Sequence, residues 1–210
     1  MNTGTKAIRI LAVDDHPTFR LGIAGLVGAQ SDMCLVAEAA NGQEAIQQFR
    51  AHLPDVTLMD LQMPEMNGLD AMIAIQGEFP DARIIVLTTY LGDVQVLRAL
   101  KAGARGYLLK TSLHKELGDT IRAVHAGRKV LSNEVSFQLA EHAGEDALTP
   151  AEIRVLRLIA EGYANKEIGA QLAISEETIK SQVRSILSKL NANDRTHAAL
   201  IGLRRGIIEL

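Results

Sequence analysis

The segment Ile84-Ile85-Val86-Leu87 decides the fold of the first part of the chain. Four consecutive large apolar residues predict a strand buried on both faces, as in a parallel sheet covered by helices. Around this segment, short apolar stretches alternate with longer amphipathic ones. The predicted strands are Ala7–Val13, Met33–Glu38, Asp55–Asp60, Arg83–Thr88 and Gly106–Leu109, and the predicted helices are Pro17–Gly28, Asn41–Ala51, Gly68–Glu78, Gly92–Ala102 and Ser112–His125. We therefore expect an α/β doubly wound, five-stranded parallel sheet.

The pattern changes after His125. Charged, turn-like segments flank a short predicted helix, Glu134–His142, so residues 127–147 are interpreted as a linker. From Thr149 onward the sequence predicts an all-α unit of four helices. The first begins at the capping box Thr149-Pro150-Ala151-Glu152 and ends at Gly162, and the others are Lys166–Leu172 capped by Asn165, Glu176–Leu190 capped by Ser175, and Asp194–Arg205 capped by Asn193. The predicted domains are residues 1–126 and 148–210.

Composition excludes several classes of protein. The chain has 210 residues, 47% of them hydrophobic, and a single cysteine, Cys34, which cannot form an internal disulfide and which we expect in the core. No apolar run approaches the length of a membrane span, and no secretory signal is visible, so we expect a cytoplasmic protein. Residues 148–210 carry a net charge of +2 although the whole chain carries −3, which is compatible with a nucleic-acid partner for the second domain.

Polar residues follow successive predicted strands. They are Asp14-Asp15, Asp60, Thr88 and Lys110. Because the carboxyl ends of parallel strands meet at one edge of the sheet, these side chains are expected in one crevice. Neighbouring carboxylates need a cation, and oxygen ligands suit Mg²⁺. A carboxylate beside Mg²⁺, a hydroxyl and an ammonium group favour formation of an aspartyl phosphate.

The same residues carry a specific resemblance. The motifs are Val13-Asp14-Asp15-His16-Pro17, Leu58-Met59-Asp60-Leu61-Gln62-Met63-Pro64 with Gly68, Leu87-Thr88-Thr89, and Gly106-Tyr107-Leu108-Leu109-Lys110. Together they resemble the receiver domain of two-component response regulators, which has a flavodoxin-like fold.

This resemblance implies a role for each residue. Asp60 is the expected phosphoacceptor, with a sensor histidine kinase as the donor. Asp15, Asp60 and the backbone carbonyl of Gln62 are the expected Mg²⁺ ligands, with Asp14 acting mainly through water. Lys110 and Thr88 are expected to bind the phosphoryl group, and the Tyr107 ring to follow Thr88. His16, His114 and His125 lack metal-ligand spacing, so surface or capping roles are expected for them.

One face of the third helix of the second domain is polar. Thr178, Lys180, Ser181, Arg184 and Ser185 lie opposite the stripe formed by Ile179, Val183 and Ile186. Such a face suits the major groove of DNA, with Ser175 and Thr178 at the helix N-terminus facing phosphates. A solvated helix face is the alternative.

Residues 148–201 resemble the LuxR-type helix-turn-helix. The resemblance is carried by Leu148-Thr149-Pro150-Ala151-Glu152, Glu161-Gly162, Asn165-Lys166-Glu167-Ile168, Ile174-Ser175, Thr178-Ile179-Lys180 and Lys189-Leu190. It implies DNA contacts from Lys180, Ser181 and Arg184, phosphate contacts near Asn165, Lys166 and Thr178, and a fourth helix that supports dimerisation. Gln182 stands where histidine is frequent, which affects sequence preference more than binding.

The order of the two domains resembles the NarL/FixJ class of response regulators. This implies a phosphorylation-dependent transcription regulator, and no enzyme beyond its own phosphoryl transfer and dephosphorylation. The expected partners are a sensor histidine kinase, promoter DNA, a second copy of the chain and RNA polymerase. Two alternatives stay open: a phosphohydrolase with an aspartyl-phosphate intermediate, and a DNA-binding protein whose first domain is only a dimerisation scaffold.

Overall fold

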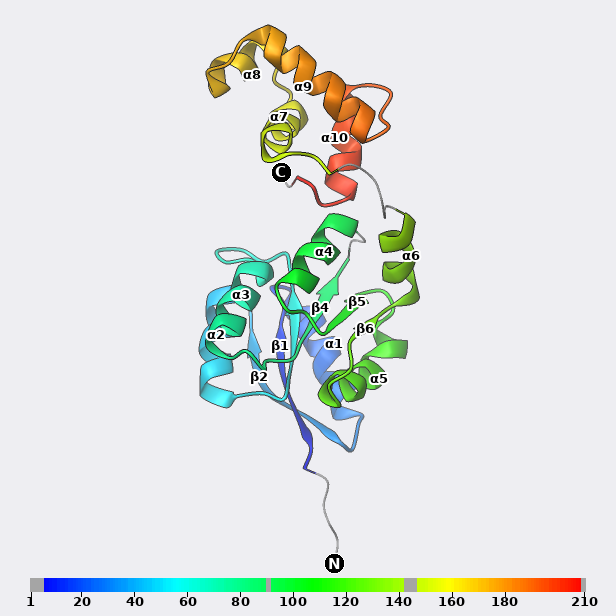
Figure 1. Ribbon diagram of the computed structural model, residues 1–210. Helices are drawn as coiled ribbons and strands as arrows, with labels where there is room; N and C mark the ends of the chain where they lie inside the picture. The colour runs from blue at the N-terminus through cyan, green and yellow to red at the C-terminus, as the bar shows by residue number, and fades with distance from the viewer. Residues whose placement is uncertain (1–5, 90–91, 142–146, 209–210) are drawn as a thin grey trace, which may run out of the picture. The chain divides into compact units, whose positions relative to one another are not determined.

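The computed structural model describes residues 6–89, 92–141 and 147–208 (Figure 1). The chain divides into two compact units. The first contains the β-sheet, and the second begins at Phe137 and contains helices α7 to α10. Asp93–Gln95, at the start of α4, also group with the second unit. His142 of the predicted linker helix, and residues 142–146 of the predicted linker, lie outside the described residues.

The first unit is built on a parallel sheet with the strand order β2-β1-β3-β4-β5-β6. The strands are β1 Ile8–Val13, β2 Met33–Ala39, β3 Val56–Asp60, β4 Ile84–Thr88, β5 Gly106–Leu109 and β6 Val130–Leu131. The helices between and after them are α1 Pro17–Gly28, α2 Gly42–His52, α3 Gly68–Glu78, α4 Asp93–Lys101 and α5 Leu113–His125. This confirms the doubly wound α/β fold.

The sixth strand is a difference from the prediction, which placed its residues in a linker. Val130 and Leu131 pair in parallel with Gly106 and Tyr107. Two residues are too few to show any periodicity, and the strand forms because the edge of β5 offers it hydrogen-bonding partners.

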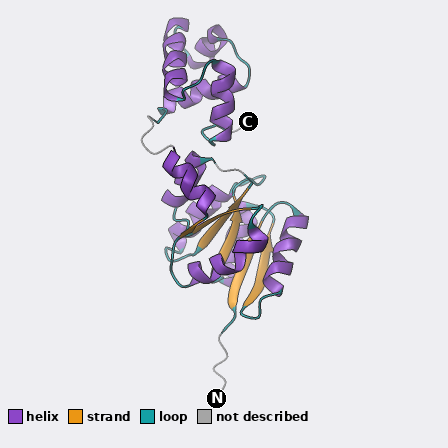
Figure 2. Cartoon of the chain, turned by 90° about the vertical axis from the view of Figure 1, so that its right-hand side faces the viewer, coloured by secondary structure: helices purple, strands orange, loops and turns teal. Residues whose placement is uncertain are grey.

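Helices cover both faces of the sheet (Figures 1 and 2). Helices α1 and α5 contact each other on one face, and α2 and α3 contact each other on the other. All residues of β3 and β4 are buried, as the apolar segment Ile84–Leu87 predicted. The core between the sheet and the α1–α5 face contains Ile10, Ala12, Ile23, Val27, Leu58, Ile85, Leu87, Leu108, Leu117, Ile121 and Val124.

The second unit is helical. Its helices are α7 Pro150–Ala160, α8 Asn165–Leu172, α9 Glu176–Lys189 and α10 Arg195–Arg204, and α6 Asn133–Glu141 spans the division between the units. Their packing buries Val155, Leu156, Ile159, Ile168, Ile179, Ile186, Leu190 and Ala198. Ile174, between α8 and α9, is 37% exposed. The all-α prediction for this part of the chain is confirmed.

The caps of these helices explain small shifts in their ends. The Thr149 capping box is present at α7. Helix α8 begins one residue earlier than predicted, because the Glu167 carboxylate accepts a hydrogen bond from the Ala164 N–H and makes Ala164 the N-cap. Helix α10 begins one residue later, because the Asp194 carboxylate accepts from the His197 N–H.

Candidate functional site

The parallel register brings the predicted crevice residues to one edge of the sheet. Asp60 ends β3 opposite Leu87, and Thr88 ends β4 opposite Leu109. Asp14 follows β1 directly and Lys110 follows β5. Each side chain therefore leaves the carboxyl end of a strand, where ligand sites form in open parallel sheets.

Lys110 joins the carboxylates of two of these strands. Its Nζ lies 2.6 Å from Asp14 Oδ2 and 2.8 Å from Asp60 Oδ2. Asp14 is fully buried, and Asp60 is only 4% exposed. Since buried carboxylates are unfavourable without a counter-charge, the ammonium group is what makes this arrangement stable.

The pKa values of these groups reflect their burial. Removal of the Asp60 carboxylate from water raises its pKa, and the bond from Lys110 only partly opposes this. For Lys110, burial works against the charged form, but the bonds to Asp14 and Asp60 outweigh it and raise the pKa. Lys110 therefore stays protonated at neutral pH.

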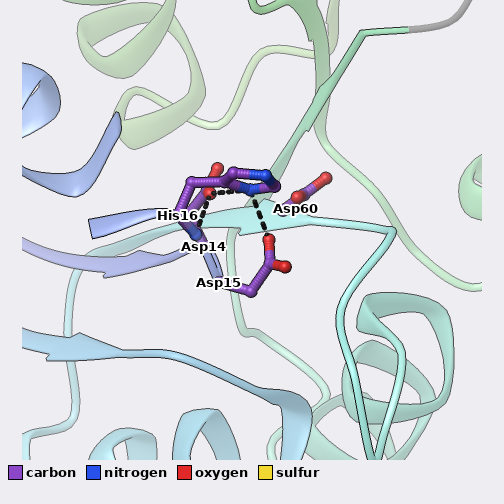
Figure 3. A group of neighbouring side chains, drawn as sticks. All are labelled: Asp14, Asp15, His16 and Asp60. Atoms are coloured by element: carbon purple, nitrogen blue, oxygen red, sulfur yellow. Dashed lines mark hydrogen bonds and ion pairs between the residues drawn. The ribbon is translucent and has the colours of Figure 1, made fainter. Parts of the chain in front are cut away.

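Three carboxylates and one imidazole gather at the mouth of the crevice. The side chains of Asp14, Asp15, His16 and Asp60 each offer a ligand atom, and these atoms all lie within 4.8 Å of one another (Figure 3). The Gln62 backbone N–H donates to Asp60 Oδ1 at 3.3 Å, which brings Gln62 beside the same carboxylate. A donor set dominated by carboxylate oxygens at this spacing fits a divalent cation such as Mg²⁺.

Thr88 and Tyr107 lie in the core next to the crevice. Thr88 is 2% exposed and Tyr107 is fully buried. Burial raises the pKa of the Tyr107 phenol, while an interaction with the Thr88 hydroxyl opposes that shift. The two side chains are thus neighbours, and a displacement of one changes the packing of the other.

Two residues of α1 contact the crevice without having been singled out by the sequence analysis. The Lys110 Nζ lies 4.6 Å from the centre of the Phe19 ring, within the range of a cation–π interaction. The Arg20 guanidinium donates to the backbone carbonyl of Asp14 and pairs with Glu38. The available signal was Pro17, which starts a helix directly after Asp14-Asp15 and so brings its first turn back to the strand ends.

Gly68 allows the chain after β3 to return against Asp60. A Cβ on Gly68 would lie 1.8 Å from the Asp60 carbonyl oxygen, and the Gly68 N–H donates to the Leu61 carbonyl at 3.0 Å. Only glycine fits here, so the first residue of α3 fixes the backbone that carries the Asp60 side chain.

In the second unit, most of the predicted DNA-contacting residues are exposed. Lys166, Ser175, Thr178, Ser181 and Arg184 are exposed. Asn165 and Lys180 are half-buried, and Ser175 caps α9 by accepting from the Thr178 N–H at 3.1 Å.

Two acidic residues surround one of these cations. Lys180 Nζ lies 3.3 Å from Glu176 and 3.5 Å from Glu177. These pairs, chiefly the bond to Glu176, raise the pKa of Lys180.

Ser185 lies elsewhere than the sequence analysis placed it. Its hydroxyl donates to Glu152 Oε1 at 2.6 Å, so it faces α7 and not the polar face of α9. Lys189 donates to the other oxygen, Glu152 Oε2, at 2.9 Å, and the Thr149 N–H donates there at 2.7 Å. Burial alone would raise the pKa of Glu152, but the bonds from Ser185, Lys189 and Thr149 lower it to about 2.

Each of the two units matches a known protein family. Residues 10–122 match the family model described as the response regulator receiver domain, and residues 146–201 match that of bacterial regulatory proteins of the luxR family. The chain therefore belongs to the response regulators that join a receiver domain to a LuxR-type helix-turn-helix. It is a DNA-binding transcription regulator of a two-component system.

Similar proteins match along almost the whole chain. The chain is 42% identical over 209 residues to the transcriptional regulatory protein LiaR of Bacillus subtilis, covering 96% of this chain and 99% of the relative. It is 38% identical over 207 residues to the response regulator protein VraR of Staphylococcus aureus, with the same coverage. A solved complex of the response regulator RcsB with DNA is 28% identical, with a TM-score of 0.73, covering 93% of this chain and 98% of that one.

Among the helices that the structure describes, none is both long and apolar enough to cross a membrane.

Proposed function

We propose that Asp60 accepts a phosphoryl group from a sensor histidine kinase and that this modification controls DNA binding by the helix-turn-helix. The observation that carries the proposal is the Asp60 carboxylate at the carboxyl end of β3, paired with Lys110 Nζ at 2.8 Å and clustered with Asp14 and Asp15. Membership of the response regulators supports it.

The transfer is a displacement at phosphorus. An Asp60 oxygen attacks, a new O–P bond forms, and the P–N bond to the kinase histidine breaks, so that the imidazole leaves with the electron pair and takes up a proton. Asp15, Asp60 and the Gln62 carbonyl would hold Mg²⁺, with Asp14 acting through water, and the bound ion would supply positive charge to the phosphoryl oxygens. Lys110 neutralises a further oxygen, and its retained proton is what makes it effective.

The change then spreads from Thr88. Its hydroxyl hydrogen-bonds the phosphoryl group, which alters the packing of the buried Tyr107 ring beside it. This local event shifts the population toward a form in which the second domain dimerises on DNA.

The second domain supplies the DNA contacts. Helix α9 enters the major groove, where Lys180, Ser181 and Arg184 reach base edges, while Asn165, Lys166, Ser175 and Thr178 contact phosphates. Residues 1–126 form the receiver together with β6, which lies within the predicted linker of residues 127–147, and residues 148–210 form the DNA-binding domain. The proposed partners are promoter DNA, a second copy of the chain and RNA polymerase. Because the matched helix-turn-helix family is bacterial, binding to promoter DNA implies a location in the cytoplasm.

The proposal is tested by intact mass after incubation with acetyl phosphate, with and without Mg²⁺. Wild-type protein and Asp119→Asn, a change at an exposed carboxylate, are expected to gain one phosphoryl group only when Mg²⁺ is present. Asp60→Asn is expected to gain none. Phosphorylation of Asp60→Asn to the same extent, or none in any sample, contradicts the proposal.

A second measurement separates the alternatives left open by the sequence. Phosphorylated protein is compared with unphosphorylated protein by analytical ultracentrifugation and by affinity for promoter DNA. Regulation predicts stronger dimerisation and tighter DNA binding. Unchanged values after full phosphorylation favour the dimerisation scaffold, and continuous release of phosphate from many equivalents of a small phosphate ester favours the phosphohydrolase.

A further inference from the structure

The imidazole of His16 faces the carboxylates of the crevice. Its Nδ1 lies 2.7 Å from Asp15 Oδ1 and 3.4 Å from Asp14 Oδ1, and it belongs to the same cluster as Asp60 (Figure 3). The His16 N–H also donates to Asp14 Oδ1 at 2.9 Å, which fixes the backbone that carries the ring. Only a surface or capping role was expected for His16 from its sequence position, and its side chain makes no capping bond to α1.

The contact between His16 and Asp15 is close without being a hydrogen bond. Asp15 Oδ1 is buried and has no hydrogen-bond partner among the residues that the structure describes, although Nδ1 approaches it to 2.7 Å. His16 Nδ1 and Asp15 Oδ1 therefore do not form a well-directed hydrogen bond with each other. A buried acceptor left in this state is unusual and points to a ligand that the site is built to receive.

The spacing suits ligands of a single metal ion. At a metal–ligand distance of about 2.1 Å, adjacent ligand atoms of one ion lie about 3.0 Å apart and opposite ones about 4.2 Å apart. The cluster atoms all lie within 4.8 Å of one another, and the closest nitrogen–oxygen distance is 2.7 Å. The His16 side chain is 71% exposed, so the ring can adjust its position without disturbing the core.

A nitrogen ligand changes which ions the site prefers. Mg²⁺ takes oxygen ligands, whereas imidazole favours borderline transition-metal ions such as Co²⁺ and Ni²⁺. We propose that His16 Nδ1 is a ligand of the crevice metal ion and gives this receiver a preference for borderline divalent transition metals beyond what its carboxylates provide. This inference rests on the metal site of the proposed function.

The test compares two ions in matched variants. Wild type, His16→Gln, His16→Ala and His114→Ala are titrated with Mg²⁺ and with Co²⁺ at pH 8 by calorimetry. His114 is an exposed histidine outside the cluster and serves as the control. Both His16 variants are expected to lose Co²⁺ affinity by about tenfold or more, while their Mg²⁺ affinity changes by less than about twofold. His114→Ala is expected to match wild type.

Proton NMR of the Co²⁺ form gives a direct readout of ligation. A histidine bound to Co²⁺ through Nδ1 shows its exchangeable Nε2–H strongly shifted by the paramagnetic ion. This signal is expected in wild type and His114→Ala and absent from both His16 variants.

Two kinds of failure are distinguishable. Equal losses for Co²⁺ and Mg²⁺, or unchanged Co²⁺ affinity without a shifted imidazole proton, overturn the role of His16 and leave the metal site of the proposed function standing. If neither ion binds wild type more tightly than it binds Asp60→Asn, the metal site itself is wrong, and the role of His16 is wrong with it.

Discussion

Lys110 supplies the positive charge that pairs with two carboxylates of the crevice. Its ammonium group contacts a fully buried carboxylate and a nearly buried one, and the Phe19 ring lies on another side of it. Removing one partner from such a group leaves buried charges uncompensated, which is more costly than losing an exposed ion pair.

Lys110→Gln is therefore expected to destabilise the metal-free protein by about 3 kcal/mol. Saturating Mg²⁺ is expected to recover part of this loss, because the cation neutralises the same carboxylates. Chemical denaturation with and without Mg²⁺ measures both effects, and Lys115→Gln, at an exposed position of α5, is the control. An equal loss in both conditions would contradict the account.

Lys180 makes a second prediction at the scale of one residue. Because Glu176 and Glu177 pair with it, part of its charge is compensated before DNA arrives. Because Lys180 is assigned to base edges, Lys180→Ala is expected to weaken binding to duplex DNA and to relax the preference for the promoter sequence. Glu176→Gln is expected to strengthen binding by about two- to fivefold, since it frees the cation and removes a repulsive charge.

Fluorescence anisotropy of labelled duplex DNA at several salt concentrations measures these effects. Lys115→Ala lies in the sheet-containing unit and is expected to bind like wild type. Weaker binding by Glu176→Gln would mean that the acid positions Lys180 and does not compete with DNA for it.

Single residues also show which parts of the site could be predicted from the sequence. The sequence predicted the common location of Asp14, Asp60, Thr88 and Lys110. Each lies at the end of a predicted strand, and strand ends can be located from the sequence alone. The contacts of Phe19, His16 and Ser185 were missed because they depend on where a side chain points after the backbone has folded. Ser185 has the helical spacing of the polar face, yet its hydroxyl binds Glu152.

At the scale of elements, the start of α3 and the end of β3 are in unusually close contact. The missing Cβ of Gly68 is what allows this approach. A methyl group there must push the loop away from the strand and move the Asp60 backbone with it.

Gly68→Ala is accordingly expected to lower the rate of phosphorylation by acetyl phosphate by at least about tenfold and to destabilise the protein. Gly77→Ala, in the same helix, has open space around the added methyl. That control is expected to phosphorylate normally and to be slightly more stable, because alanine favours helix more than glycine does. Equal phosphorylation rates for the two variants would contradict a positioning role for Gly68.

Glu152 joins the N-terminus of α7 to the C-terminal half of α9. Its pKa is about 2 in the folded protein and near 4.5 when unfolded. A lowered pKa stabilises the folded state above pH 4.5, and the contribution is lost as pH falls from about 4.5 to about 2.

Glu152→Gln is expected to lower the free energy of unfolding at pH 7 by up to about 3 kcal/mol. The difference from wild type is expected to shrink below pH 4.5, whereas Glu161→Gln, at an exposed position, should follow wild type throughout. Denaturant titrations between pH 3 and pH 7 measure the free energy of unfolding of each protein. If the difference between wild type and Glu152→Gln did not depend on pH, the lost stability would be due to packing alone.

The elements of the sheet were predictable to within about one residue at their ends. Long apolar or amphipathic segments can be recognised from sequence, because the spacing of their apolar residues reflects which face of the helix or strand is buried. The observed N-caps of α8 and α10 differ from the predicted ones by one residue, because capping depends on which acidic side chain reaches the free N–H groups. The strand β6 could not be predicted, because its two residues are too few to show an apolar periodicity.

At the scale of the whole molecule, the two units do different chemistry and differ in charge. The first 126 residues carry −3, and residues 148–210 carry +2. Phosphorylation replaces the single negative charge of the Asp60 carboxylate by nearly two charges on the phosphoryl group, so the acidic crevice gains about one negative charge. Lys110 is the basic side chain there that pairs with both Asp14 and Asp60. Phosphorylation and the binding of a divalent cation are therefore expected to favour each other.

The short strand β6 also determines where the first unit can be cut. A fragment that stops at Ala126 removes Val130 and Leu131 and leaves the backbone groups of Gly106 and Tyr107 at an open sheet edge. Open edges pair with other chains, so this fragment should self-associate or precipitate on storage. A fragment that continues to Ser136 keeps the edge covered and should remain monomeric by light scattering. The six residues before α6 are thus expected to protect the sheet against aggregation.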